Sequence, residues 1–285
     1  MNKSQVQKAI VFIILFTFAI IVSLPLWMLI ISSFLGQQEA VERLGMIFDK
    51  DSSQYANIVL WVKYPTLRHY IELLLDTPEF FIMFWNSMKQ ESCILLGQLL
   101  VGMPAAWAFA RYRFPGRHLL FTVYTILMVL PFQVTMVSSY LVLDKMGLMD
   151  TMWSVVLPNI FATFPIFLMT KFFQRIPKDL IESACLDGAS ELQLFAHIGI
   201  PMGAPGILSA LILGFIEYWN NVEQPVAFLS DKTLWPISLY MSHIRLDNIG
   251  LAMVAAVISL IPAILLFLSG QKYLEQGIMA SGLKE

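Results

Sequence analysis

The sequence predicts an all-α, polytopic membrane protein with six transmembrane helices. Hydrophobic residues make up 58% of the 285-residue chain, charged residues only 13%, and the mean hydropathy is +0.70. This composition leaves too little polar surface to keep a globular domain of this size in solution. Apolar stretches close to the roughly 20 residues that cross a bilayer recur six times, which indicates six spans.

Each span is expected where a nearly charge-free stretch occurs. The predicted spans of this single domain, 1–285, cover about residues 9–31, 86–110, 119–141, 151–171, 205–225 and 250–271. The fifth is the least well bounded, because Glu217 and Glu223 interrupt the apolar run that follows Pro205. Pro131 and Pro165 are interpreted as kinks of the kind that membrane helices tolerate.

The first apolar stretch has two interpretations. Lys3 and Lys8 precede it, as basic residues precede the apolar region of a secretory signal peptide. The stretch is longer than such a region and no convincing small-residue cleavage site follows it. A retained membrane anchor is therefore favoured.

The distribution of Lys and Arg predicts that both termini are cytoplasmic. Cytoplasmic loops are richer in these residues, and with the N-terminus inside, the inner segments include Arg111, Arg113 and Arg117, interpreted as interface anchors rather than as contacts to a partner. The segment 36–85 is relatively acidic and is expected outside, whereas 173–204 is expected inside. The net charge of −2 gives no reason to expect nucleic acid as a partner.

Enzymatic motifs are missing from the sequence. It contains no phosphate-binding loop, no zinc-protease helix motif and no serine-hydrolase elbow, so we expect no catalytic residues. The four histidines are scattered along the chain, and no metal site is expected. Cys93 lies in the second predicted span and Cys185 in an inner loop, so a disulfide between them is not expected either.

One polar passage lies between two apolar runs and needs a separate explanation. Residues 181–201 read IESACLDGASELQLFAHIGIP. Pro177 and Asp179 suit the first turn of a helix, and the small residues around Gly188 indicate a bend. The passage is too polar to cross the bilayer. It is either an ordinary loop on the headgroups or a rigid docking helix with a carboxylate for a basic partner.

The same passage resembles the EAA loop of permease subunits in bacterial binding-protein-dependent ABC importers. The matching residues are Glu182, Ser183, Ala184, Asp187, Gly188 and Ala189, followed by Phe195, Ile198 and Pro201. Ser183 replaces the usual first alanine of that pattern, and Cys185 replaces a residue that is often basic. Further segments resemble the carbohydrate-type permeases, similar to the second permease of the maltose importer: AAWAFARYRFPGR (105–117), LPFQVTMVSSYLVLDKMGLMDT (130–151), IEYWNNVEQPVAFL (216–229) and GIMASGLKE (277–285).

This resemblance implies a type I importer permease fold in the bacterial inner membrane, surrounded by membrane lipid. It implies a second permease subunit, two ATPase subunits and an extracytoplasmic substrate-binding protein as partners. The matched residues 182–184 and 187–189 would then form the coupling helix that seats on an ATPase subunit. ATP and Mg would be held by the ATPase subunits, and no cofactor is expected on this chain.

Polar residues inside the predicted spans are candidates for the substrate path. Glu217, Trp219, Asn220 and Asn221 combine a carboxylate, amides and an aromatic ring, which would suit a sugar. Glu217 has a second interpretation, as the partner of a cation on the other permease.

Two polar residues of the third predicted span belong to the same group of candidates. Gln133 and Thr135 either hold helices together or face the path.

A stand-alone secondary transporter or channel is the alternative function. Such a protein is expected to carry ionisable residues in several spans or paired broken helices in related halves. Glu217 is nearly the only charge identified near the centre of a predicted span, which disfavours that alternative. The identity of the transported solute does not follow from these residues.

Overall fold

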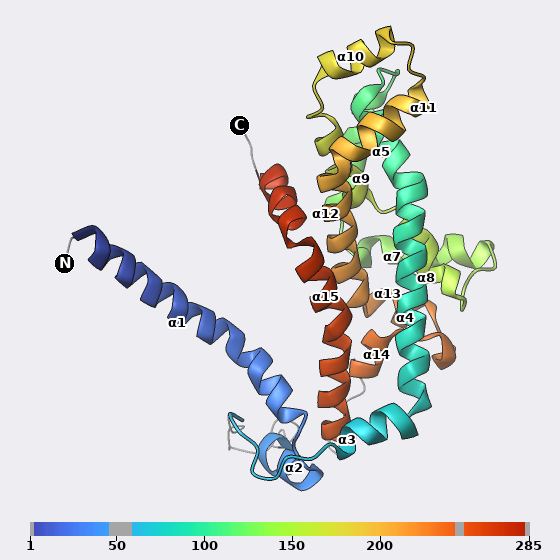
Figure 1. Ribbon diagram of the computed structural model, residues 1–285. Coiled ribbons are helices and arrows are strands. Elements are labelled where there is room, and N and C mark those ends of the chain that lie inside the picture. Colours follow the sequence, from blue (N-terminus) through green and yellow to red (C-terminus); the bar gives the residue numbers. More distant parts are fainter. Residues whose placement is uncertain (1–2, 46–58, 243–247, 283–285) are drawn as a thin grey trace. The chain divides into compact units, whose positions relative to one another are not determined.

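The computed structural model describes residues 3–45, 59–242 and 248–282, and within these ranges the chain forms helices and no strand (Figure 1). The prediction of an all-α fold is confirmed. Parts of the predicted outer segment 36–85 and the end of the predicted cytoplasmic tail 277–285 lie outside the described residues, as does His243.

Five helical stretches are long and apolar enough to cross a membrane. They cover Gln7–Ser32, Pro78–Arg111, Met152–Phe173, Glu191–Trp219 and Ile249–Glu275. A bent pair of shorter helices between the second and third stretches brings the total to six if the pair is one span. The expected number of spans is thereby accounted for among the described residues.

The first and the last of these stretches are continuous helices, α1 (Lys3–Ser32) and α15 (Ile249–Gly282). The other three contain irregular turns. The second joins α4 (Pro78–Gly97), a π-helical turn (Gln98–Gly102) and α5 (Met103–Arg111), and the next joins α8 (Met152–Ile160) to α9 (Thr163–Phe173).

The predicted third span, 119–141, is not one continuous helix. Helix α6 (Arg117–Val129) and helix α7 (Phe132–Lys145) are bent by 109° at their junction. Pro131 lies at the break, and the preceding Leu130 is extended (ψ 128°), as a residue before proline prefers. With its 13 residues, α6 is about 20 Å long, too short to cross a hydrocarbon core of about 30 Å alone. Pro131 therefore breaks the span rather than kinking it.

The predicted fifth span, 205–225, is displaced at both ends. The helix begins with α11 (Glu191–Leu194), continues through a π-helical turn (Phe195–Gly199) and ends with α12 (Ile200–Trp219). Pro205 does not start the helix but lies inside it. The chain then turns at Asn220 and forms α13 (Glu223–Phe228), a 3-10 turn (Lys232–Leu234) and α14 (Ile237–Ser242).

The chain divides into two compact units, which are described separately. The first unit comprises residues 1–81 and 240–261 and contains α1, α2 (Gln37–Leu44), α3 (Arg68–Ile71) and a π-helical turn (Glu72–Asp76). Its small core is formed by Leu35, Ala40, Leu44, Val59 and Ile249.

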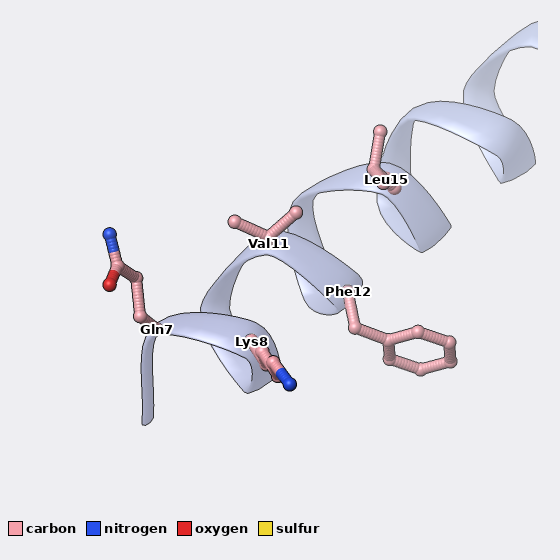
Figure 2. A pocket seen from close by; sticks show the side chains of 5 residues that line it. All are labelled: Gln7, Lys8, Val11, Phe12 and Leu15. Carbon is pink, nitrogen blue, oxygen red and sulfur yellow. The ribbon is translucent and has the colours of Figure 1, made fainter. Parts of the chain in front are cut away.

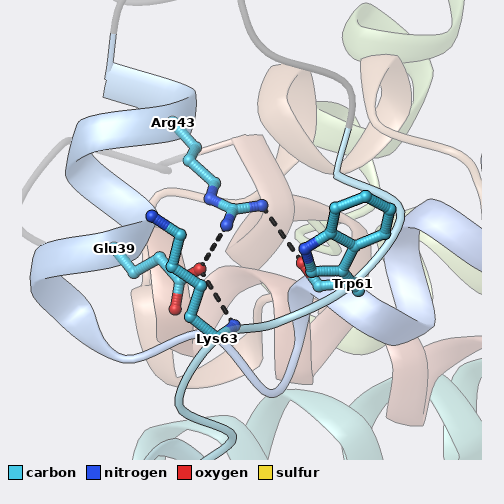
Figure 3. A network of polar contacts seen from close by, with 4 residues as sticks. All are labelled: Glu39, Arg43, Trp61 and Lys63. Carbon is cyan, nitrogen blue, oxygen red and sulfur yellow. Dashed lines mark hydrogen bonds and ion pairs between the residues drawn. The ribbon is translucent and has the colours of Figure 1, made fainter.

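Polar contacts hold α2 of the first unit against an extended segment (Figure 3). Arg43 pairs with Glu39 at 2.6 Å and donates to the Trp61 carbonyl oxygen at 3.1 Å, while the Lys63 amide donates to Glu39 at 3.3 Å. By contrast, the apolar side chains of α1 are exposed. Figure 2 shows a shallow hollow on α1 that is lined by residues of this single helix, from Gln7 to Leu15, and so encloses no site.

The second unit comprises residues 82–239 and 262–285, and its core lies where α5, α9 and α12 pack together (Figure 1). Two glycines of α12 permit a close approach to α9. A Cβ atom at Gly206 would lie 2.3 Å from Phe172 Cγ, and one at Gly203 would lie 2.3 Å from Phe173 Cε1. Small residues at such crossings are a common device of membrane helix packing.

Candidate functional site

The predicted docking passage is a helix followed by a tight corner. Helix α10 (Lys178–Leu186) begins directly after Pro177, and Asp179 lies in its first turn, near the positive end of the helix dipole. Pro177 is therefore the N-cap residue of α10 and does not lie in the first turn, where it was expected. Figure 1 shows α10 and α11 together at one end of the second unit.

Gly188 ends α10 in a backbone conformation that favours glycine. Its φ is +82°, and the amide of Ala189 donates to the Ala184 carbonyl while that of Gly188 donates to the Cys185 carbonyl, each at 3.0 Å. These two bonds form a Schellman motif. A Cβ atom at Gly188 would meet nothing within 4 Å in this chain, so the requirement for glycine there comes from the backbone conformation.

Ser190 starts the next helix through a reciprocal capping box. The Gln193 side chain accepts from the Ser190 amide at 2.8 Å, and the Ser190 hydroxyl accepts from the Gln193 amide at 3.4 Å. The helix-ending motif, which includes Ala189, is therefore followed directly by the helix-starting motif at Ser190. The two motifs make α10 and α11 a defined corner, which we call the coupling segment (residues 178–194).

Buried apolar side chains and one hydrogen bond attach the coupling segment to the spans. Ile181 is only 1% exposed and belongs to the same core cluster as Trp107 and Phe173. The Tyr112 hydroxyl donates to Glu191 Oε2 at 2.8 Å. Partial burial, together with this hydrogen bond and the negative charge of Glu191, raises the pKa of Tyr112, so the hydroxyl keeps its proton at neutral pH.

The outward face of the coupling segment carries the residues expected to meet a partner. Glu182, Ser183, Asp187 and Gly188 are exposed, whereas Ala184 and Ala189 are half-buried. Apolar side chains of the same segment also face solvent, chiefly Leu186 at 89% and Leu192 at 75% exposure. A groove of about 460 Å³ runs between the turn and α11, lined by Ala184, Asp187, Gly188, Ala189, Gln193 and Leu194, with His197 and Ile198.

Trp219 does not present a free ring face to a substrate. It is 5% exposed, its ring stacks on Phe215 with centroids 5.4 Å apart, and it meets Phe84 edge to face at 5.8 Å. The sequence-based interpretation of Trp219 as a stacking platform therefore conflicts with its position. Its neighbours make it part of the packing between α12 and α4.

The other candidates lie around the C-terminus of α12: Glu217 is in the last turn of the span, and Asn220 and Asn221 follow the helix. Glu217 and Asn220 are exposed, and Asn220 donates to the Ile216 carbonyl at 2.8 Å. Asn221 precedes α13 and accepts from the Gln224 amide at 3.3 Å. Helix α12 ends at Trp219, so both asparagines shape a turn.

The two polar residues of the third predicted span make local contacts. Gln133 donates to Glu223 Oε2 at 2.7 Å and so joins α7 to α13, as expected for a residue that holds helices together. Thr135 donates to the Phe132 carbonyl of its own helix at 3.1 Å. Gln133 and Glu223 are nevertheless exposed on this chain.

A buried polar network that the sequence analysis missed connects the π-helical turn Gln98–Gly102, which follows α4, with α8, α12 and α13. The Gln98 side-chain nitrogen lies 2.8 Å from both the Asn159 carbonyl and the Tyr218 hydroxyl. The Asn159 amide group donates to Gln224 Oε1 at 2.7 Å. Gln98 and Gln224 are buried, and such costly groups inside membrane segments are retained when they hold helices together or serve transport.

Glu91 is the most unusual member of this region. It is 3% exposed, and neither carboxylate oxygen has a hydrogen-bond partner among the described residues. It borders a cavity of about 10 Å³ together with Asn159 and Tyr218, enough for about one water molecule. The predicted second span, 86–110, contains Glu91, but the sequence analysis did not include it among the polar residues of the spans. Counting every carboxylate inside the span would have identified this residue.

These features define an integral membrane protein whose spans carry polar groups, as the spans of transport proteins do. The chain belongs to the family described as binding-protein-dependent transport system inner membrane component, whose model matches residues 98–280. The matched region contains both the coupling segment and the buried polar network except Glu91. The resemblance drawn from residues 181–201 is thereby confirmed at the level of the family.

Curated relatives are similar over most of the chain. An arabinooligosaccharides transport system permease protein of Halalkalibacterium halodurans is 26% identical over 270 residues, which cover 93% of this chain and 92% of the relative. An osmoprotective compounds uptake permease protein of Synechocystis is 31% identical over 207 residues, 70% of each chain. These relatives are permease proteins, which confirms that the chain is a transport subunit and not an enzyme.

Solved structures share the fold. One is a bacterial ABC transporter involved in the import of the acidic polysaccharide alginate, matched with a TM-score of 0.75 at 20% identity, covering 96% of this chain and 98% of that one. Another is the alginate transporter in complex with an alginate pentasaccharide-bound periplasmic protein, with a TM-score of 0.55 at 19% identity, covering 71% and 80%. The predicted importer permease fold is confirmed.

Proposed function

We propose that this chain is one of two permease subunits of an ATP-driven importer and that its coupling segment transmits the motion of the ATPase subunits to the spans. The observation that carries the proposal is the corner formed by α10 and α11. It is fixed to the core by Ile181, stiffened by the Gly188 and Ser190 motifs, and exposes Leu186 and Leu192. A rigid projection with apolar side chains suits a partner groove better than it suits water.

The proposed cargo is a carbohydrate or a related polar solute. The supporting observation is that relatives of this chain are named as permease proteins of arabinooligosaccharides and polygalacturonan/rhamnogalacturonan transport systems. The second of these relatives, from Bacillus subtilis, is 24% identical, and the match covers 99% of this chain and 99% of the relative.

Exposed polar groups support a second permease as partner. Glu217 and Asn220 at the end of α12, and the Gln133–Glu223 pair, lie on the surface of this single chain. Polar groups that face lipid are costly, whereas a path or another subunit can satisfy them. We infer that this surface faces the second permease, with Gln133, Thr135, Glu217, Asn220 and Asn221 as path candidates and Trp219 as their packing support.

The remaining partners follow from the same proposal. Two ATPase subunits would hold ATP and Mg, this chain would hold no cofactor, and an extracytoplasmic binding protein would deliver the solute. Both termini and the coupling segment would be cytoplasmic. A thiol reagent added from outside should then label a cysteine at position 60 and not one at position 114 or 190. Labelling of position 190 from outside would mean that the chain has the opposite orientation.

The test of coupling compares two glycines with the same backbone constraint. Gly188→Val in the coupling segment and Gly147→Val in the turn after α7 both place a branched side chain at positive φ, at +82° and +66°, and in open space. In a reconstituted complex, Gly188→Val should abolish the ATPase stimulation caused by loaded binding protein. Gly147→Val should retain it at equal complex assembly.

Equal stimulation in the two variants would contradict the proposed role of the coupling segment. Solute uptake by this chain in vesicles that lack any ATPase subunit would instead support the alternative, a stand-alone secondary transporter or channel.

A further inference from the structure

Three spans end around one basic pocket of the second unit. The pocket has a volume of about 420 Å³ and lies where α5 ends, α6 begins and α9 ends, beside the first turns of α10. We call it the basic pocket, and the side chains that matter for its chemistry are Trp107, Arg111, Arg113, Arg117, Lys178 and Glu182. Its other walls are mainly apolar side chains of the core, including Phe173 and Ile181.

The charges in the basic pocket are unbalanced. Four cationic side chains share it with one carboxylate, Glu182. No ion pair joins any of the four to an acidic residue in the part of the chain that the structure describes. Arginine guanidinium groups match the geometry of phosphate oxygens and bind them through paired hydrogen bonds. The unpaired charge therefore calls for an anion, and three arginines favour a phosphate.

A buried donor also lies in the pocket wall. Trp107 is 4% exposed, and its indole N–H has the Tyr112 hydroxyl nearby as an acceptor but does not reach the geometry of a full hydrogen bond. This weakly satisfied donor is available to an anion in the pocket. Helix α6, which is 13 residues long, also begins at Arg117, so the positive end of its dipole is directed toward the same region.

The position of the pocket at the ends of the spans indicates lipid as the source of the phosphate. Because the second span ends at Arg111, α6 starts at Arg117 and the fourth span ends at Phe173, the pocket lies at the level of the headgroups on either possible orientation. Helix α6 has no buried residue and exposes Leu119 and Leu120 immediately beyond Arg117. An acyl chain could follow this apolar surface while its headgroup stays among the arginines.

We propose that the basic pocket binds the headgroup of an anionic phospholipid through Arg111, Arg113 and Arg117. Basic pockets between membrane helices are known sites for such headgroups. The proposal depends on the membership of the chain in a membrane family and not on its cargo or on ATPase coupling. If the lipid site is disproved, the proposed function is unaffected. If the proposed function is disproved, the lipid site is likewise unaffected.

The test uses the full chain in its transporter complex, purified in detergent at about 0.15 M salt, where weak surface attraction is screened. Short-chain phosphatidylglycerol and phosphatidylcholine are titrated separately. The rise in melting temperature with lipid concentration gives the apparent affinity for each lipid. The wild type should prefer phosphatidylglycerol. Each of Arg111→Gln, Arg113→Gln and Arg117→Gln should reduce that preference by about fivefold, the contribution of one basic residue near an anionic surface.

Arg175→Gln is the matched control. Arg175 is exposed on the segment after α9, lies over the Phe172 ring at 5.4 Å, and does not line the pocket. It should keep the full preference for phosphatidylglycerol. If the arginine variants do not accumulate, native mass spectrometry of the wild-type complex should still find phosphatidylglycerol retained over phosphatidylcholine.

Three results would overturn the proposal. The first is equal affinity of the wild type for the two lipids, with neither retained in the mass spectrum. The second is an equal shift in melting temperature with inorganic phosphate alone, which would indicate a site for a free oxoanion. The third is loss of ATPase subunits from the arginine variants with lipid preference unchanged, which would indicate a site for an acidic protein segment.

Discussion

The Tyr112 hydroxyl donates a hydrogen bond to the Glu191 carboxylate at 2.8 Å, which joins the end of the second span to the beginning of α11. This bond and the burial of Ile181 are two separate attachments of the coupling segment to the membrane helices. Motion of the segment should therefore reach both the second and the fifth spans. Neither attachment would be expected from a loop that lies loosely on the headgroups.

Removing the Tyr112 hydroxyl should weaken this attachment. Tyr112→Phe should cost roughly 0.5 kcal/mol of stability, because the bond is partly exposed to solvent, and should reduce stimulated ATP hydrolysis more than basal hydrolysis. Tyr140→Phe, at a similarly exposed tyrosine of α7, is the control and should change neither rate. Equal effects of the two variants on stimulation would show that the hydrogen bond does not serve coupling.

The crossing of α9 and α12 should not tolerate a larger residue at Gly206. Gly206→Ala would place a methyl group 2.3 Å from Phe172 Cγ, so we expect about 1–3 kcal/mol of destabilisation from overpacking. Gly102→Ala, where the nearest atom would be at 3.4 Å, should be neutral or slightly stabilising. The melting temperatures of the two variants check this. Wild-type stability of Gly206→Ala would mean that the helices separate without cost.

Trp219 and Asn220 should differ in their effects although they are adjacent. Trp219→Ala removes a buried ring that contacts Phe215 and Phe84, so it should destabilise the chain by about 3–5 kcal/mol. Asn220→Ala should leave assembly intact and impair uptake, because the exposed amide lies among the path candidates. Assembly yield and solute uptake separate the two. Normal assembly of Trp219→Ala with lost uptake would restore Trp219 as a substrate contact.

Glu91 and Gln98 should have opposite effects on stability when they are replaced. Because an isolated buried carboxylate is costly, Glu91→Gln should leave the stability of the chain equal or raise it. Gln98→Leu should lower the stability by about 1–3 kcal/mol, because the Tyr218 hydroxyl and the Asn159 carbonyl lose their donor. Lys89→Gln, exposed two residues away, should change it by less than about 0.5 kcal/mol. Strong destabilisation by Glu91→Gln would reveal a partner for that carboxylate.

The sequence predicted the features that depend on local composition and spacing. Six apolar stretches, the helix after Pro177 and the bend at Gly188 follow from residue types whose preferences are strong. The displaced fifth span shows where this reasoning fails. Pro205 lies inside α12, because a membrane helix can absorb a proline when neighbouring groups satisfy its backbone.

Tertiary contacts could not be predicted from single residues. Nothing local distinguishes Gln98 in a buried network from Gln133 at the surface, and a tryptophan suitable for a sugar is equally suitable for packing against Phe215. Likewise, Pro131 gave no indication of a 109° break rather than a kink. These distinctions depend on which helices become neighbours.

The most direct test of the central claim is a cross-link between the coupling segment and an ATPase subunit. With the exposed Cys185 and the half-buried Cys93 replaced by serine, Leu186→Cys should be captured by a bifunctional thiol reagent in the reconstituted complex, because Leu186 is the most exposed apolar residue of the segment. Val142→Cys, exposed on α7, is the control and should give no such product. The account predicts a covalent adduct of this chain and the ATPase subunit from Leu186→Cys alone. Absence of the adduct in a complex that hydrolyses ATP and transports solute would contradict it.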